Sequence, residues 1–213
     1  MTYTFPFDTC EIPYRHSKHI AQPFSALINV ISVGILVIAI VLAKTSSIQV
    51  FFGALLVFEL IHTYSHIRHL PGHIQMNVIH AVAYIVNLSY LAIFIGLTGT
   101  VSPYLLVSYA AILLLDVYFF ARNQFLGYFT TQIVLGLLVT VFYMNYILRF
   151  VPIYWLIALL GLNVVLIALF INEKNNCASM LASRPFPYHI LVEWIGLVVI
   201  VVYIRILLFL NAR

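Results

Sequence analysis

The sequence predicts an all-α membrane protein, a bundle of seven transmembrane helices that forms one domain over residues 1–213. Two features of its composition exclude an ordinary soluble protein. The chain is 64% hydrophobic and 8% charged, whereas soluble domains carry about 25% charged residues. Its mean hydropathy of +1.09 leaves too little polar surface to coat a water-soluble globule. A third observation, the apolar segments repeated along the whole chain, indicates how many helices to expect.

Seven segments come close to the roughly 20 apolar residues that a helix needs to cross about 30 Å of hydrocarbon. They cover residues 24–43, 48–68, 74–95, 103–122, 127–148, 151–172 and 187–209. Pro23 and Pro187 lie near helix starts, where a missing N–H costs little. The longest polar stretch, Glu173 to Pro187, is predicted to be a loop before the last helix.

The polar segment 1–23 precedes the first helix and is expected to pack over that end of the bundle. It has neither a continuous apolar core nor a small-residue cleavage site, so it does not look like a signal peptide. No polar stretch is long enough to hold a second domain. The basic residues are scattered through short loops, which indicates topology signals rather than a nucleic-acid surface.

The ionisable side chains are distributed unevenly across the predicted membrane. We call the side that holds the N-terminus the N-face. All the histidines and acids fall on this face or within a few turns of it: His16, His19, His62, His66, His69, His73, His80, His189, Asp8, Glu11, Glu59, Asp116, Glu173 and Glu193. Ionisable groups at membrane depth are costly and usually functional. We therefore predict one polar chamber that opens to the N-face.

The spacing of these residues predicts a metal site in the chamber. His62 and His66 are four residues apart, and so are His189 and Glu193, so each pair shares one face of its helix. Two facing helices would then offer three or four nitrogen and oxygen ligands, and imidazole with carboxylate is the pattern of catalytic zinc. Glu59, His80 and Asp116 are predicted to line the same chamber.

Several of the other polar residues have simpler interpretations. Histidines beside turns or outside the helices are expected to face headgroups or solvent: His16, His19, His69 and His73. An ion pair with Arg122 would equally explain Asp116. Glu193, about two turns into an apolar helix, needs a cation or a proton there.

The N-terminal residues resemble a known family. The segment Asp8-Thr9-Cys10-Glu11-Ile12-Pro13-Tyr14, followed by Ile20-Ala21-Gln22 and Asn29, is similar to the start of the alkaline ceramidases, which reads D-W-C-E-x-N-Y and then I-A-E. That family belongs to a wider group of seven-helix membrane hydrolases that includes the progestin and adiponectin receptors. The resemblance implies a zinc-dependent hydrolase that uses water to cleave the amide of ceramide.

The family's marks are S-x-x-x-H in helix two, Asp at the start of helix three and H-x-x-x-H at the start of helix seven. The resemblance places the zinc ligands at His66, His189 and Glu193, with Glu193 where the family has histidine. His62 stands in the place of the catalytic Ser, and Asn77 in that of the catalytic Asp. An imidazole can still donate a hydrogen bond, but an amide only orients a water or a hydroxyl. A His/His/Glu set is one that hydrolytic zinc accepts.

Two other alignments of the same marks are open. In one, Ser65 and His69 form the S-x-x-x-H pair and His80 takes the place of the Asp. In the other, His189 is the second histidine of the last helix, which puts Pro185 in the first place and leaves the site one ligand short. The alignment through His62 and His66 is preferred, because it puts the ligand inside the helix rather than in the turn.

The resemblance also implies a calcium site in the N-terminal segment. Asp8 and Glu11 match calcium ligands of the family. Its later ligands, Asn and Glu, are replaced here by Pro13 and Gln22. A carbonyl of Gln22 could still bind calcium, so a weakened site is expected.

A disulfide is the last feature that the resemblance implies. Cys10 matches a cysteine that pairs with the loop before helix seven, where Cys177 lies. A disulfide would place the N-face in an oxidising lumen or outside the cell. The N-face has six Lys and Arg residues and the opposite face four, which weakly favours a cytoplasmic N-face. We give precedence to the cysteines and expect a multi-pass protein of the endomembranes or plasma membrane with a lumenal or extracellular N-face.

Three functional classes follow. The first is a zinc-dependent hydrolase whose partner is a membrane lipid, ceramide or a related amide. The second is a lipid-binding or receptor-like member of the same fold without catalysis, favoured by the changes at His62 and Asn77. The third is a di-iron or haem redox protein, since Glu59-x-x-His62-x-x-x-His66 resembles part of a di-iron site. The lack of histidines near the opposite face disfavours the third class.

Overall fold

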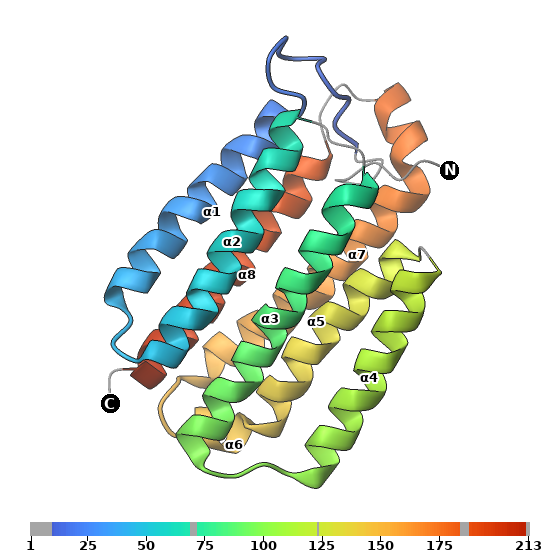
Figure 1. Cartoon of the computed structure of the whole chain (residues 1–213). Helices are drawn as coiled ribbons and strands as arrows, with labels where there is room; N and C mark the ends of the chain where they lie inside the picture. The colour runs from blue at the N-terminus through green and yellow to red at the C-terminus, as the bar shows by residue number, and fades with distance from the viewer. Residues whose placement is uncertain (1–9, 69–71, 123, 184–187, 212–213) are drawn as a thin grey trace.

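The structure of the chain is a computed structural model that describes residues 10–68, 72–122, 124–183 and 188–211. These residues form helices and no strand (Figure 1). The helices are α1 (Pro23–Leu42), α2 (Ser46–Arg68), α3 (Gly72–Thr98), α4 (Pro103–Ala121), α5 (Phe125–Phe142), α6 (Met144–Ile147), α7 (Ile153–Ser183) and α8 (His189–Asn211). The long helices lie side by side in one bundle and run alternately up and down. The predicted all-α fold is confirmed.

Six helices are long and apolar enough to cross a membrane, in the part of the chain that the structure describes. They are α1, α2, α3 from His80 onward, α4, α7 as far as Glu173, and α8. Each coincides with one predicted span, which makes the chain a multi-pass integral membrane protein. The remaining predicted span, 127–148, corresponds to the shorter apolar helix Leu126–Phe142, and its crossing stays a prediction.

The helix ends follow from local chemistry. Pro23 and Pro103 are the first residues of α1 and α4, where proline's fixed φ suits the helix and no N–H is lost. Gly99 follows α3 with a φ of +65° and donates its N–H to the carbonyl of Ile95 at 2.8 Å. A residue without a Cβ adopts this left-handed conformation without strain, so α3 ends there.

The predicted loop between Glu173 and Pro187 is wrong for most of its length. Helix α7 continues to Ser183, ten residues beyond the end of its apolar span at Glu173. The polar residues mark where the helix leaves the hydrocarbon, not where it ends. Glu, Lys, Ala, Met and Leu in this stretch all favour a helix. The extension carries Cys177 above the end of the bundle.

The helices pack as two groups, α1 with α2 and α8, and α4 with α5, which are joined through α3 and α7; α3 contacts α2 as well as α5. Helix α1 lies against α2 and α8, and α8 also contacts α7. Helix α4 lies against α5, which contacts α3 and α7. At Gly127 on α5, a Cβ atom would lie 2.6 Å from the ring of Phe119 on α4. The two helices approach so closely there that a larger residue would clash.

The apolar core fills the half of the bundle away from the N-face. Its largest fully buried side chains include Leu36, Phe52, Tyr90, Phe94, Leu135, Leu159 and Ile206. On the same side, the side chain of Asn211 accepts hydrogen bonds from the backbone N–H groups of Lys44 and Thr45, each at 2.9 Å. The end of α8 is therefore fixed beside the turn between α1 and α2.

The N-terminal segment lies over the other end of the bundle. The backbone N–H of Ala21 donates to the carbonyl of Ile67 at 3.0 Å, and that of Gln22 to the carbonyl of His66 at 2.9 Å. These bonds satisfy carbonyl groups at the end of α2 that lack an intrahelical partner. They also place Gln22 next to the histidines of that helix.

Candidate metal centre

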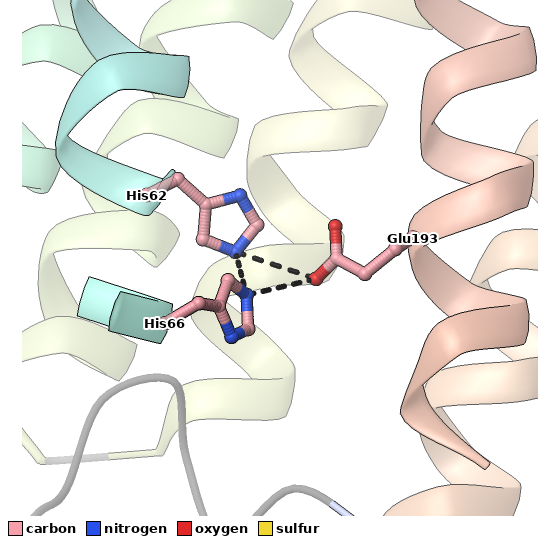
Figure 2. A group of neighbouring side chains, drawn as sticks. All are labelled: His62, His66 and Glu193. Carbon is pink, nitrogen blue, oxygen red and sulfur yellow. Dashed lines mark hydrogen bonds and ion pairs between the residues drawn. The ribbon is translucent and has the colours of Figure 1, made fainter. Parts of the chain in front are cut away.

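Three side chains from two distant parts of the sequence meet between α2 and α8 (Figure 2). His62 and His66 lie on the last turns of α2, and Glu193 lies on the second turn of α8. His66 is fully buried and Glu193 is 7% exposed. One ligand atom of each residue lies within 4.8 Å of the other two. We call these residues, together with His189, the histidine cluster.

The fourth member, His189, is the first residue of α8. Its Nε2 lies 2.7 Å from Oε1 of Glu193, one helical turn away. The ring is not oriented for a hydrogen bond to that oxygen, and this buried nitrogen has no hydrogen-bond partner. Nε2 of His189 and Oε1 of Glu193 are thus close to each other without forming a well-oriented hydrogen bond.

The spacing of the donor atoms fits a small divalent ion. Nε2 of His66 lies 3.1 Å from both Nε2 of His62 and Oε1 of Glu193, and the latter two atoms are 3.5 Å apart. Tetrahedral zinc with bonds of about 2.0–2.1 Å has ligand atoms about 3.3–3.4 Å apart. The triangle of His62, His66 and Glu193 therefore has edges close to those of a zinc tetrahedron, whereas Nε2 of His189 lies closer to the carboxylate oxygen, at 2.7 Å, than two ligands of one zinc ion do.

Gln22 determines which nitrogen of His66 carries the proton. Its side-chain N–H donates to the carbonyl of Glu11 at 2.9 Å, and its Oε1 lies 2.7 Å from Nδ1 of His66. Because a carbonyl only accepts, the amide nitrogen must face Glu11 and the amide oxygen must face His66. Nδ1 of His66 is then the donor. Its Nε2 presents a lone pair to the cluster, as a metal-binding histidine does.

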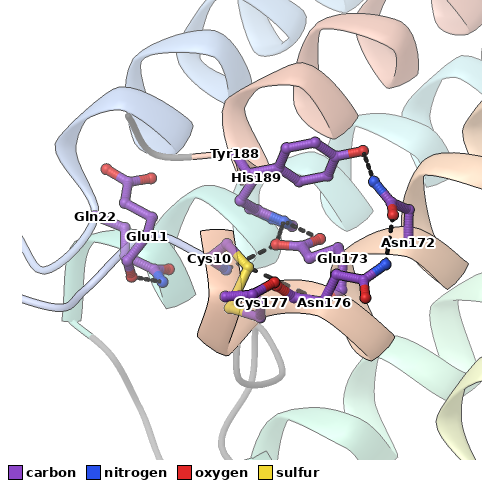
Figure 3. Close-up of a disulfide and its surroundings, with 10 residues drawn as sticks. Cys10, Glu11, Gln22, Asn172, Glu173, Asn176, Cys177, Tyr188 and His189 are labelled. Carbon is purple, nitrogen blue, oxygen red and sulfur yellow. Dashed lines mark hydrogen bonds and ion pairs between the residues drawn. A yellow bond between two sulfur atoms is a disulfide. The ribbon is translucent and has the colours of Figure 1, made fainter. Parts of the chain in front are cut away.

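Glu173 has the same effect on His189 (Figure 3). Nδ1 of His189 lies 3.0 Å and 2.9 Å from the two carboxylate oxygens of Glu173. The same carboxylate accepts the backbone N–H of Cys10 at 2.8 Å. Nδ1 therefore donates, and in the neutral ring Nε2 presents a lone pair to Glu193. A carboxylate behind a histidine is the usual arrangement in zinc sites.

The disulfide lies directly beside this carboxylate. Cys10 and Cys177, the pair that the resemblance implied, are joined in the structure. The bond connects the N-terminal segment to the extension of α7 that also carries Glu173. The segment that bears Gln22 and the helix that bears Glu173 are thus covalently linked next to the cluster.

His62 differs from the other two histidines. Its Nδ1 lies 3.1 Å from the side-chain nitrogen of Asn29 on α1. In this orientation the amide donates to Nδ1, and Nε2 of His62 carries a proton that faces the cluster. Turning the amide around would reverse both roles and make Nε2 a ligand atom. His62 can therefore serve as a hydrogen-bond donor or as a further ligand.

The donor set itself calls for a positive charge. Two imidazole lone pairs, from His66 and His189, face one oxygen of Glu193 at 3.1 Å and 2.7 Å. Lone pairs and a carboxylate repel at these distances unless a proton or a metal cation lies among them. Glu173 adds a second negative charge behind His189. A divalent ion fits the charge of these groups.

The remaining predicted site residues have different positions. The side chain of Asn77 on α3 and all of Asp8, His69 and Pro185 lie outside the described part of the structure. Ser65 donates its hydroxyl to the carbonyl of His62 at 2.6 Å, so it faces its own helix. Four residues of the preferred alignment, His62, His66, His189 and Glu193, lie in the cluster, and its Asn77 stays a prediction.

Glu11, a predicted calcium ligand, interacts with the start of α1. Its carboxylate accepts the backbone N–H groups of Phe24 and Ser25 at 3.1 Å and 3.2 Å, and the hydroxyl of Ser25. A carboxylate at a helix N-terminus is stabilised by the free N–H groups and the helix dipole. Calcium binding stays a prediction.

Asp116 and His80 form a second polar cluster rather than part of the first. Asp116 is fully buried on α4, and its carboxylate accepts the hydroxyl of Tyr84 at 2.7 Å and that of Thr131. Nε2 of His80 lies 3.2 Å from the same carboxylate. The alternative partner, Arg122, lies instead over an aromatic ring of its own helix, 5.6 Å from the ring centroid. We predicted that Asp116 and His80 line one chamber together with the histidines of α2. The side-chain hydrogen bonds of Asp116 are instead with α3 and α5.

Three residues that support the cluster were not identified in this role from the sequence. Gln22 was considered only as a calcium ligand and Asn29 only as part of the family pattern. Glu173 was considered only as an acid of the N-face and as the start of a loop. Their partners are 44, 16 and 33 positions away. A glutamine or glutamate near a membrane surface is common, and nothing in the sequence around it indicates that it will bond to a distant histidine.

No protein-family model, curated protein or solved structure matches this chain significantly. The resemblance to the alkaline ceramidases therefore depends on the residues quoted for it. What the chain does has to be argued from the histidine cluster and its setting in membrane-length helices.

Proposed function

We propose that the protein is a zinc-dependent intramembrane hydrolase of a lipid amide, with a ceramide-like substrate. The observation that carries this proposal is the convergence of the Nε2 atoms of His66 and His189 on one buried carboxylate oxygen of Glu193. In this proposal His66, His189 and Glu193 hold the zinc ion. Gln22 and Glu173 fix the two imidazoles in the ligating form.

The chemistry that such a site supports is hydrolysis by water. Bound zinc would supply a Lewis acid that polarises an amide carbonyl and makes water easier to deprotonate. The N–H of His62, directed at the cluster, is placed to donate a hydrogen bond to the oxygen on which negative charge develops. Asn77 stands where the family has a base and would only orient a water or a substrate hydroxyl.

The setting of the site supports a lipid as the substrate. The ligands lie near one end of helices that are long enough to cross the membrane. In a bilayer this end is near the headgroups, which is where the amide of a two-chain lipid lies. The specific assignment to ceramide comes from the resemblance of the N-terminal segment.

We also propose that the bundle crosses the membrane seven times. Helix α5 ends at Phe142, and α6 extends the same segment to Ile147. At 1.5 Å per residue, the stretch from Phe125 to Ile147 would be roughly 34 Å long, enough for the hydrocarbon core. With seven crossings the N-face and the end of α8 lie on opposite sides, and the disulfide favours a lumenal or extracellular N-face.

Zinc analysis and ceramide turnover test the proposal. The purified protein is expected to contain one zinc ion per chain and to release fatty acid from a ceramide in mixed micelles. His66→Ala should lose zinc and activity together, because His66 contributes a ligand from a fully buried position. His19→Ala is the matched control, since this histidine is exposed on the N-terminal segment.

Each outcome has a definite meaning. Chelation of the wild-type protein should abolish turnover, and added zinc should restore it. Wild-type protein that contains zinc but turns over no amide lipid would favour the receptor-like alternative. Asn77, which stands where the family has a catalytic Asp, agrees with that alternative. Native protein without metal would contradict the proposal.

A further inference from the structure

Glu59 is a buried carboxyl group on the same face of α2 as the histidine cluster. It precedes His62 by three residues and His66 by seven, and such positions lie on one side of a helix. Its exposed fraction is 5%. Phe52, seven residues earlier, is fully buried on the same side. The side chain therefore lies on the buried side of α2.

Among the described residues, Glu59 is the one buried acid without a hydrogen-bond or ion-pair partner. The other buried acids all have partners: Glu11 at the start of α1, Asp116 with Tyr84, Glu173 with His189, and Glu193 with His66.

An unpaired carboxyl at this depth has a physical cost that calls for an explanation. Buried polar groups are almost always hydrogen-bonded, and ionisable residues inside membranes are rare and mark functional sites. A valine or leucine would fill the position without this cost. Hydrolysis of an amide, in turn, needs a group that protonates the departing nitrogen, and Asn77 cannot supply a proton as an acid does.

We propose that Glu59 is the proton-transfer residue that protonates the leaving nitrogen of the amide substrate. This inference rests on the proposed function of the histidine cluster. The family has an Asp where this chain has Asn77, so that position has no carboxyl group here. The inference assigns the role of the acid to Glu59 instead.

The step balances with water as the only co-reactant. The oxygen of water forms a bond to the carbonyl carbon, and one proton of that water passes to a second water molecule. The C–N bond then breaks with its electron pair on nitrogen, and nitrogen takes the proton of Glu59. Glu59 regains a proton from the one released by water. The products are a carboxylic acid and an amine.

The position of Glu59 suits this role. Three residues of helix correspond to about 4.5 Å along its axis, so Glu59 lies one turn farther from the N-face than His62. A lipid whose amide is at the cluster extends its chains in that direction. A general acid needs to reach the reacting nitrogen directly or through one water, and a glutamate one turn away has that reach.

Three variants of the full-length protein test the inference: Glu59→Gln, Glu59→Asp and the control Thr63→Val. Thr63 is buried on the same face of α2 and bonds only to the backbone of Glu59. Each variant is measured for zinc content, thermal unfolding, kcat and KM on a ceramide in mixed micelles. Infrared spectra, read independently of activity, report the C=O stretch of a protonated carboxyl group.

For Glu59→Gln we expect unchanged zinc content, a kcat lower by about 100-fold or more and a KM within about threefold. Its infrared spectrum should lack one carboxylic-acid band that the wild type and Thr63→Val show. Glu59→Asp should regain part of kcat, which also covers the case in which Glu59→Gln does not fold. Glu59→Gln with a kcat within about threefold of an active wild type would overturn the inference alone. A wild type without turnover would instead contradict the proposed function.

Discussion

At the scale of single residues, Gln22 and Glu173 decide what the cluster can bind. Each accepts the Nδ1 proton of one histidine, at 2.7 Å for Gln22 and at 2.9 Å for Glu173. Without these partners each imidazole could turn or carry its proton on Nε2, where it would block a metal. The residues behind the ligands are therefore as important to the site as the ligands themselves.

Gln22→Ala is expected to weaken zinc binding while the fold is kept. The substitution removes the acceptor for Nδ1 of His66, and loss of such an outer partner typically lowers metal affinity by about 10–100-fold. Competition with a fluorescent zinc chelator measures the change. Gln49→Ala is the control, because the amide of Gln49 also bonds to a backbone carbonyl but at the opposite face. Equal zinc affinities of Gln22→Ala and Gln49→Ala would show that Gln22 does not orient His66.

The sequence predicted the members of the histidine cluster better than the residues that form hydrogen bonds to its histidines. Two pairs with i, i+4 spacing in apolar helices identified His62, His66, His189 and Glu193, because helical geometry fixes which side chains share a face. Gln22 and Asn29 reach their histidines only through the packing of α1 and the N-terminal segment against α2. No local pattern encodes that packing, so their roles became visible only in three dimensions.

At the scale of helices, the polar cluster around Asp116 connects α3, α4 and α5. Its carboxylate accepts hydrogen bonds from Tyr84 on α3 and from Thr131 on α5. Hydrogen bonds of this kind hold membrane helices together where lipid offers no alternative partner. Because α4 packs mainly against α5, Asp116 provides its polar link to α3.

Asp116→Leu is expected to destabilise the bundle without removing zinc. It leaves the hydroxyl group of Tyr84 without its acceptor in an apolar setting, which should cost about 1–3 kcal/mol of unfolding free energy. Thr131 can still donate to the carbonyl of Tyr128, at 2.7 Å. Unfolding in detergent, followed by heat or denaturant, measures the loss. Asn163→Leu serves for comparison, because the side chain of Asn163 bonds only within its own helix. A stability loss no larger than that of Asn163→Leu would contradict the role of Asp116.

The sequence predicted the helices well but some of their ends poorly. Apolar length locates the membrane-crossing part of a helix, and it placed α1, α2, α4 and α8 to within a few residues. It carries no information on where a helix ends in water. Helix α7 accordingly runs to Ser183, although its apolar stretch ends at Glu173.

At the scale of the whole molecule, the bundle has a polar half and an apolar half. The histidine cluster, the disulfide and the Asp116 cluster belong to helix segments near the N-face. The large apolar core lies toward the opposite face, where Asn211 anchors the end of α8. A lipid substrate would accordingly meet the ligands with its headgroup region near the N-face. If the polar half lies at one surface of the membrane, each long helix, including α5, has to cross from that surface to the other.

The sidedness of the molecule tests that requirement and the orientation together. A glycosylation acceptor before Cys10, one between Lys44 and Ser46 and one after Arg213 would report which positions face the lumen. With seven crossings and a lumenal N-face, only the first should be glycosylated, because the disulfide needs an oxidising compartment. The acceptor between α1 and α2 is the internal control, since Asn211 holds the end of α8 beside that turn. Glycosylation both before Cys10 and after Arg213 would show that α5 does not cross the membrane. Glycosylation only between Lys44 and Ser46 and after Arg213 would show that the N-face is cytoplasmic.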